Sequence, residues 1–332
     1  MWVVNYKSKL KMKALFRTCL ALAMALSMAA CGEKTTYEPE DDSQWAPVVD
    51  PEEDEEEPED QGKEEDEGKE EEKPQKKDTI KVMSFNIRTG TSDKGTPNAW
   101  DNRKPGVYEM IKAEQPLIVG LQECHIFQRD DITSNCPDYV GFGIGRDNAS
   151  ETSGESCSVI YNKKLCSIEK WGSFWLSPTP DKISIGWDAE YNRIATWAVV
   201  KVKANDKKFF FINTHLDHKG MTAQEESMKL IMNKFAELNT EKLPQVLVAD
   251  FNQVQNNPIF KVCLETMVNA RLKAKKTDSK ATYNNWGSKA QIIDHIFVSG
   301  FDIPQYKTVN QEWAGVRYIS DHFPIYALLT FK

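Results

Sequence analysis

Residues 245–252 read Gln-Val-Leu-Val-Ala-Asp-Phe-Asn, and this stretch shows the pattern that decides the fold. Its first part is an apolar run of strand length, which is typical of a strand buried on both faces. Asp250 and Asn252 follow just beyond the run. Because alternate residues of an extended segment face the same side, these two polar side chains should point together. The stretch therefore predicts a buried strand that presents polar groups at its end.

Five further apolar runs carry one or two of Asn, Glu, Asp or His at one end or just beyond it. These ends are Ser84-Phe85-Asn86, Leu121-Gln122-Glu123, Asn213-Thr214-His215, Ile293-Asp294-His295 and Ser320-Asp321-His322. Ionisable groups are costly inside a core unless they are paired or bind a metal ion. A single Asp-His pair would mean little, but six such strand ends in one domain predict a shared polar cleft.

Strands and helices are predicted to alternate from Thr79 to the end of the chain. The apolar runs of strand length cover 80–87, 116–121, 158–161, 195–202, 209–213, 245–248, 292–298 and 323–331. Apolar residues at helical spacing predict helices over 104–114, 222–239 and 258–267. This pattern predicts an α/β domain with one large central sheet, or two sheets, covered by helices.

The charge of the chain is unevenly placed. The 332 residues include 42 basic and 50 acidic ones, and the formal net charge is −8. The segment 38–72 alone holds 20 acidic and 2 basic residues, whereas beyond Asp78 there are 31 basic and 28 acidic residues. The acidity therefore belongs to a tail and does not exclude a phosphate-rich substrate for the domain. Composition does exclude collagenous, coiled-coil and polytopic membrane proteins.

Residues 1–30 are predicted to be a lipoprotein signal peptide. A basic start near Met12 precedes the apolar run 20–28, and Ala29-Ala30-Cys31 follows. This order is typical of a signal peptide, and the run is shorter than the roughly 20 residues that span a membrane. Small residues before Cys31 resemble a bacterial lipobox, so Cys31 is the expected lipidation site. An ordinary secretory signal cleaved near Ala30 is the alternative.

Residues 31–78 are predicted to be the lipidated cysteine followed by a disordered acidic tether. This segment is rich in Glu and Pro and has too few apolar residues to fold. We therefore expect an exported lipoprotein at the outer membrane, on its periplasmic or cell-surface face, that meets the membrane through the lipid anchor only. A monomer is the default expectation.

Five cysteines remain after those of the signal and the lipobox. They are Cys124, Cys136, Cys157, Cys166 and Cys263. An odd number in an exported domain leaves at least one free thiol. Since no CxxC pair is present, a zinc cluster is not expected, and neither is a catalytic cysteine. Cys124 is interpreted as a core residue.

The ordered set of strand ends resembles the endonuclease/exonuclease/phosphatase superfamily. That group includes pancreatic deoxyribonuclease, abasic-site endonucleases, sphingomyelinases, inositol polyphosphate 5-phosphatases and the CCR4-type deadenylases. The resemblance covers residues 79–332 in the family's order, and it rests on Phe85-Asn86-Ile87, Leu121-Gln122-Glu123, Asn213-Thr214-His215-Leu216, Asp250-Phe251-Asn252, Ile293-Asp294-His295-Ile296 and Ser320-Asp321-His322-Phe323-Pro324.

Further motifs refine this resemblance. The stretches 175–178, 186–188 and 193–197 resemble a bacterial exported branch of the superfamily. Two positions depart from the family pattern: Ala249 stands where Gly is usual, and His295 where many members have Tyr or an apolar residue. The resemblance implies a deoxyribonuclease-I-like α+β sandwich of two packed, mixed β-sheets flanked by helices, with the site at one edge of the sheets. It makes 79–332 the catalytic domain.

A divalent metal ion is expected in the cleft. Phosphoester hydrolysis requires neutralisation of the charge that gathers on the phosphoryl group. Hard oxygen ligands suit Mg²⁺ or Mn²⁺. Glu123 is the best primary ligand, with Asn86 and Asp321 as companions, directly or through water. In isolation, Glu123 would be read as a helix-capping or surface carboxylate.

Water activation is expected from one of two residues. The resemblance implies that Asp250 orients or deprotonates the attacking water while Asn252 donates to a phosphate oxygen, although Asp-x-Asn is also an ordinary turn sequence. His322 is the second candidate base. Asp294 matches the family position whose carboxylate fixes the histidine tautomer. The choice between Asp250 and His322 stays open.

The remaining site residues concern the phosphate and the leaving group. By the resemblance, His215 would sit across the phosphate, stabilising charge or protonating the leaving oxygen. Glu155 is its candidate partner, or else a loop carboxylate. Arg193 is a candidate phosphate ligand, with a structural ion pair as the alternative. Asp217 and His218 would extend the cleft wall, bind a second metal ion or lie in a solvated loop.

Other conspicuous residues favour ordinary structural roles. His125 and His295 are expected to be structural or peripheral, and most of the tryptophans of the stretch 171–197 to be core. The basic residues of 271–276 are expected to be a solvated loop rather than a guide for a polyanion.

The sequence thus predicts a divalent-metal-dependent phosphoester hydrolase, in the first place a phosphodiesterase. Its substrate would be nucleic acid, a phospholipid headgroup or a sugar or inositol phosphate, and the choice between a nuclease and a lipid or sugar-phosphate phosphodiesterase stays open. The competing hypothesis is a non-enzymatic surface lipoprotein that binds a phosphorylated ligand or glycan on the same fold.

Overall fold

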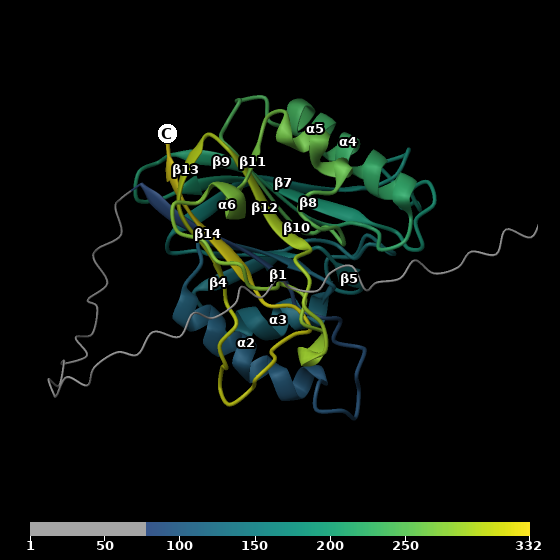
Figure 1. Cartoon of the computed structure of the whole chain (residues 1–332), viewed down its shortest axis with the longest axis vertical. Helices are drawn as coiled ribbons and strands as arrows, with labels where there is room; N and C mark the ends of the chain where they lie inside the picture. The colour runs from purple at the N-terminus through teal and green to yellow at the C-terminus, as the bar shows by residue number, and fades with distance from the viewer. Residues whose placement is uncertain (1–77) are drawn as a thin grey trace, which may run out of the picture. The chain divides into compact units, whose positions relative to one another are not determined.

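Two six-stranded sheets pack face to face in the computed structural model, which describes residues 78–332 (Figure 1). The first sheet has the order β13 (Phe301–Thr308), β14 (Ile325–Phe331), β1 (Thr79–Asn86), β2 (Ile118–Gln122), β6 (Val159–Asn162) and β4 (Tyr139–Phe142). The second has the order β11 (Val268–Asn269), β12 (Asp294–Ser299), β10 (Gln245–Asp250), β9 (Lys208–His215), β8 (Ile194–Val202) and β7 (Cys166–Trp175). A short ladder joins β3 (Cys124–His125) to β5 (Glu155–Ser156). The expected sandwich of two mixed sheets is confirmed.

Each sheet contains one parallel pair of strands, and this pair determines where the polar residues gather. β1 runs parallel to β2, and β9 runs parallel to β10, whereas the other ladders are antiparallel. Parallel neighbours need a crossover connection, which is supplied here by α2 (Trp100–Glu114) and α4 (Met221–Leu238). Parallel strands end at the same edge of their sheet. Asp250 is therefore in register with His215, and Asn86 with Gln122, the residue before Glu123.

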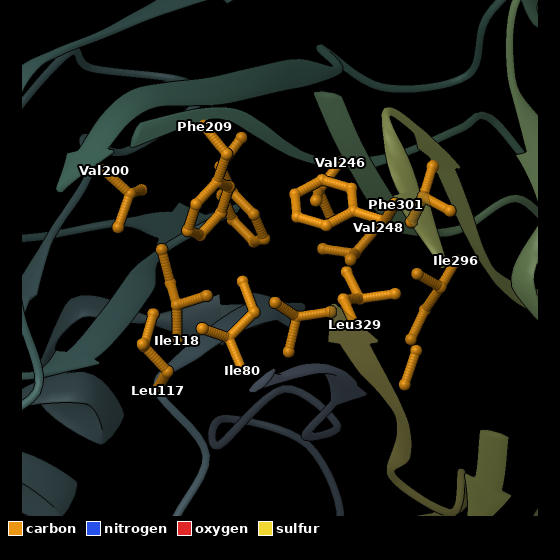
Figure 2. Packing of buried hydrophobic residues seen from close by; sticks show 14 of the residues in the cluster. Ile80, Leu117, Ile118, Val200, Phe209, Val246, Val248, Ile296, Phe301 and Leu329 are labelled. Atoms are coloured by element: carbon orange, nitrogen blue, oxygen red, sulfur yellow. The ribbon is translucent and has the colours of Figure 1, made fainter. Parts of the chain in front are cut away.

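The apolar core lies between the sheets. Figure 2 shows Ile80, Ile118 and Leu329 of the first sheet facing side chains of the second, among them Phe209 and Val246. Successive residues of a strand point to opposite faces. The outer faces are buried as well, because helices cover them, so the central strands read as nearly continuous apolar runs.

Helices cover both outer faces of the sandwich (Figure 1). On the first sheet, Met110 and Ile111 of α2 pack with Met83 and Phe85 of β1, and α3 (Ile126–Asn135) lies beside α2. On the second sheet, α4 packs against β9 and β10, followed by the 3₁₀ turn η2 (Pro258–Phe260) and α5 (Lys261–Leu264). The remaining short elements are α6 (Ala270–Lys273) and η3 (Asn285–Gly287). None of the helices within residues 78–332 has the length and apolarity that crossing a bilayer would require.

Several elements differ from the sequence prediction. The helix expected over 258–267 is instead η2 followed by the four-residue α5. β7, an edge strand with exposed residues in its middle, was not predicted because it has no apolar run. α3, β4 and β13 were also missed. All five cysteines of the described part are buried and free, and Cys124 is a core residue as expected. The predicted signal peptide, Cys31 and tether up to residue 77 lie outside the described residues.

Candidate active site

A cleft of about 730 Å³ opens at the strand ends of both sheets. Nine residues predicted from the sequence line it: Glu123, Glu155, Arg193, His215, His218, Asp250, Asn252, Asp321 and His322. Asn86 and Asp294 lie just beneath the surface and contact lining residues. The predicted polar cleft is therefore present, and it is built from segments that are far apart in the chain.

His322 lies between two carboxylates. Its Nδ1 is 2.9 Å from Asp294 Oδ2, and its Nε2 is 3.6 Å from Asp250 Oδ2. All three side chains are almost fully buried. Against the effect of burial, the charges of Asp294 and Asp250 raise the pKa of His322. Burial and the charge of Asp294 raise the pKa of Asp250. The trio therefore favours a protonated His322, and it raises the pKa of Asp250 to about 7, close to neutral pH.

Asp250 takes part in a turn and also faces the cleft. Its Oδ1 accepts a hydrogen bond of 2.8 Å from the backbone N–H of Asn252, which has a left-handed φ of 53°. The ordinary Asp-x-Asn turn is thus present. Its Oδ2 accepts from the Asn86 amide at 2.9 Å, so Asp250 joins the second sheet to the first. The turn fixes one carboxylate oxygen and leaves the other facing both histidines.

His215 is buried and neutral. Burial and the charges of Arg193 and Arg146 hold its pKa well below the usual value. Its Nε2 lies 2.9 Å from Asn252 Nδ2, which also donates to the Leu216 carbonyl at 3.1 Å. Since the carbonyl identifies Nδ2 as the amide nitrogen, Nε2 is the acceptor and Nδ1 carries the proton. That Nδ1 has no hydrogen-bond partner among the described residues.

Glu155 is not the partner of His215 that the sequence suggested. Its carboxylate instead lies 2.5 Å from Arg146 Nη1. Burial raises the pKa of Glu155 while the Arg146 charge opposes this. Arg146 comes from a loop with no sequence motif, so this ion pair could not be expected from the sequence.

The predicted metal ligands lie on the side of the cleft that the first sheet forms. Glu123 Oε1 accepts from Asn86 Nδ2 at 3.1 Å, and Glu123 Oε2 accepts from the Thr89 N–H at 3.2 Å. Burial raises the pKa of Asp321, and the charge of Glu123 adds to this effect. Arg88 Nη1 lies 3.6 Å from Asp321 Oδ2.

This donor set fits a hard divalent cation. Glu123 and Asp321 provide carboxylate oxygens whose mutual repulsion a cation would relieve. Asn86 Oδ1 accepts from the Arg88 N–H at 3.0 Å, so its amide would have to turn before this oxygen could bind a metal ion. Asp250, Asp294 and His322 form a second possible set, with ligand atoms within 4.8 Å of one another. His322 Nδ1 is already hydrogen-bonded there, which favours proton transfer as the role of this trio.

Asp217 organises one wall of the cleft. Its Oδ2 accepts from Arg193 Nε at 3.3 Å and from the Glu190 N–H at 3.1 Å, and its Oδ1 accepts from the N–H groups of Lys219 and Gly220. Despite burial, these donors lower the pKa of Asp217. The alternative of a structural ion pair for Arg193 is therefore realised, although its side chain also lines the cleft. His218 lines the same wall.

Sequence reasoning missed several cleft residues. Arg88, Arg146, Tyr191 and Tyr283 line the cleft, and the Tyr283 ring centroid is 4.8 Å from that of His322. These residues lie in loops, where no periodic signal marks them. Arg88 directly follows the motif Phe85-Asn86-Ile87, and this proximity was the one sequence signal for any of the four residues.

The two histidines expected to be structural or peripheral have such positions. His295 is buried among aromatic rings, with Nε2 2.9 Å from the Gln253 carbonyl, and His125 is the N-cap of α3. Of the tryptophans in the stretch 171–197, only Trp175 is fully buried. Trp197 packs in part against the core, Trp187 is half-buried and Trp171 is exposed, so the expectation that most of them are core is wrong, although none lines the cleft. Of the basic residues of 271–276, Arg271 is buried in α6, whereas the three lysines are exposed and do not line the cleft.

Comparisons with known proteins agree with this architecture. A model of the Endonuclease/Exonuclease/phosphatase family matches residues 83–322. A solved protein of that family from Bacteroides thetaiotaomicron is 33% identical, with a TM-score of 0.71, covering 76% of this chain and 98% of that chain. A mannosyl-6-phosphatase of the same species is 32% identical, with a TM-score of 0.70, covering 76% of this chain and 100% of that chain. A mimivirus protein, L388 of Acanthamoeba polyphaga mimivirus, is 25% identical over 276 residues, which are 74% of this chain and 98% of its own length.

Proposed function

Because the chain belongs to the endonuclease/exonuclease/phosphatase family, whose members are phosphoester hydrolases, we propose that it hydrolyses phosphorylated sugars or glycans with a divalent metal ion. One observation carries the proposal. The cleft combines a carboxylate pair suited to a cation with a buried Asp-His-Asp trio and an amide donor. Phosphoryl transfer requires these three functions together, namely charge neutralisation, water activation and positioning.

In the proposed mechanism, Asp250 accepts a proton from the attacking water. Its raised pKa suits a general base that works near neutral pH. His322, whose pKa the two flanking carboxylates raise, stays protonated and stabilises negative charge beside Asp250. Asp294 holds the His322 ring through Nδ1. We therefore propose Asp250, rather than His322, as the base.

Asn252 is the proposed donor to a phosphate oxygen, and His215 orients it. Both amide hydrogens are donated in the structure, to His215 Nε2 and to the Leu216 carbonyl, so the bond to Leu216 has to give way when the phosphate binds. Because His215 Nε2 accepts from the Asn252 amide, this imidazole is a positioning group rather than the acid that protonates the leaving oxygen. Glu123 and Asp321, with Asn86 after its amide turns, would hold the Mg²⁺ or Mn²⁺ ion. When bound, such an ion supplies charge stabilisation and orients the substrate.

The preference for a sugar phosphate rests on similarity. The mannosyl-6-phosphatase from Bacteroides thetaiotaomicron is aligned over its whole length with this chain at 32% identity. A mannosyl-6-phosphatase acts on a sugar phosphate monoester, so the proposal moves from the phosphodiester favoured by the sequence towards a monoester.

A substrate panel tests the proposed function. The purified full-length protein is incubated with Mg²⁺ and, separately, mannose 6-phosphate, bis(p-nitrophenyl) phosphate, sphingomyelin and a single-stranded oligonucleotide. We expect mannose 6-phosphate to give the highest kcat/KM. Preference for the oligonucleotide or sphingomyelin would reassign the substrate, and binding of phosphorylated sugars without turnover would favour a non-enzymatic binding protein.

We further propose that the protein is an exported lipoprotein anchored in the outer membrane through Cys31. The basic, apolar and small-residue order before Cys31 supports this. Cells that express the protein should incorporate labelled palmitate into it and retain it in the outer-membrane fraction, and Cys31→Ser should abolish both. Labelling of the serine variant would contradict the assignment.

A further inference from the structure

Tyr191 presents an exposed aromatic ring on the wall of the cleft. It is 47% exposed and lines the cleft together with His215. The guanidinium carbons of Arg146 and Arg193 lie 5.3 and 6.0 Å from its ring centroid. The His218 ring stacks against it with a centroid distance of 6.1 Å and an interplanar angle of 16°. A large exposed ring held from several sides beside a reaction centre is a surface on which a flat or ring-shaped group can stack.

Each basic side chain around Tyr191 lies beside an acid. Arg146 pairs with Glu155 at 2.5 Å, Arg193 with Asp217 at 3.3 Å, and His218 with Glu190 at 3.0 Å. This part of the cleft therefore carries donors and acceptors side by side and little net charge. Such pairs suit hydroxyl groups, which both donate and accept hydrogen bonds. A nucleic-acid strand instead draws its affinity from cations that are free to neutralise successive phosphates.

We propose that Tyr191 and the ion pairs around it form the subsite for the uncharged sugar ring of the substrate. The apolar face of a pyranose would lie on the Tyr191 ring, while Arg146, Glu155 and His218 bind its hydroxyls. This inference rests on the proposed hydrolysis of sugar phosphates and adds the residues that select the leaving group.

The subsite is held in place before any substrate binds. Asp217 binds the backbone of Glu190 and the side chain of Arg193, the residues that flank Tyr191 and its neighbour Asn192. Asn192 Nδ2 donates to Asp147 Oδ1 at 2.8 Å, which ties this loop to the one that carries Arg146. Because the ring is anchored through both flanking segments, binding loses little to ordering of the loop.

The test compares two substrates that differ only in the group bound to the phosphate. Release of inorganic phosphate from mannose 6-phosphate and from propyl phosphate is measured with the full-length protein and its Tyr191→Ala and Tyr191→Phe variants. Stacking on an aromatic ring contributes on the order of a tenfold change in affinity. We expect Tyr191→Ala to lower kcat/KM for mannose 6-phosphate about tenfold through KM and to leave propyl phosphate within about twofold.

Two controls make the result specific. Tyr191→Phe keeps the ring and should retain most of the selectivity. Trp171→Ala removes an exposed ring that does not line the cleft, and it should alter neither substrate. Thermal unfolding of each variant confirms that the fold is intact.

The outcomes separate the two proposals. Equal losses of kcat/KM on both substrates would overturn the sugar subsite and leave phosphoester hydrolysis in place. The same conclusion would follow if an oligonucleotide inhibited as strongly as mannose 6-phosphate binds and if Tyr191→Ala weakened this inhibition. Absence of phosphate release from both substrates in the unmodified protein would refute the proposed function, and the subsite with it.

Discussion

The buried imidazole of His295 makes a quantitative prediction about stability and pH. Its ring packs against Phe251, Phe260 and Phe297, and its Nδ1 has no hydrogen-bond partner among the described residues. Burial lowers the pKa of His295 from 6.5 to about 4. The folded protein therefore binds this proton less readily than the unfolded chain does. The contribution of neutral His295 to the free energy of unfolding is fully present above pH 6.5, and it is lost as the pH falls towards 4.

The magnitude follows from the two pKa values. At about 1.36 kcal/mol per pH unit, the whole difference is about 3 kcal/mol, and about 2 kcal/mol of it is lost by pH 5. Replacement of His295 by Phe removes the titrating group and places another aromatic ring in an aromatic cluster. The variant loses the bond to the Gln253 carbonyl, so it starts from a lower stability at pH 7.

Urea unfolding followed by tryptophan fluorescence measures the effect at pH 7 and pH 5. The unmodified protein should lose about 2 kcal/mol more than His295→Phe between these pH values. Other buried groups titrate equally in both proteins and cancel in the comparison. The control Leu272→Ala changes an exposed side chain that carries no titrating group, and it should keep the pH dependence of the unmodified protein. An identical pH dependence in His295→Phe would refute the reasoning.

Two further predictions concern the site. Asp294→Asn removes the charge that holds His322 Nδ1, and kcat for mannose 6-phosphate should fall about 10³-fold with a smaller change in KM; a loss confined to KM would argue against a positioning role. Asp217→Asn leaves the buried Arg193 charge unpaired and should lower the free energy of unfolding by about 3 kcal/mol, whereas Lys219→Gln at the exposed edge of the same loop should change it little. Urea titration measures both variants, and similar stabilities would contradict the assigned role of Asp217.

The sequence predicts the strands that are buried on both faces, because burial leaves an unbroken apolar run. It also predicts the residues at their ends, since a carboxylate such as Asp250 is rarely placed beside a core strand without a function. β7 escaped prediction because an edge strand with one exposed side has no such run.

The loop residues of the cleft could not be predicted in the same way. Arg146 and Tyr191 are far apart in the chain, and only the folded loops bring them together. Glu155 is a residue whose place was predicted but whose partner was not. Its position next to the site was expected, but its pairing with Arg146 rather than His215 depends on loop geometry that no local pattern encodes.

The most direct test of the account is the kcat for phosphate release from mannose 6-phosphate by the unmodified protein and by Asp250→Asn, each with Mg²⁺ and after EDTA. We predict turnover only for the unmodified protein with Mg²⁺, because a positioned general base contributes about 10²–10⁴-fold and the cation neutralises phosphoryl charge. Turnover by Asp250→Asn within about tenfold of the unmodified rate, or turnover that survives EDTA, would contradict the account.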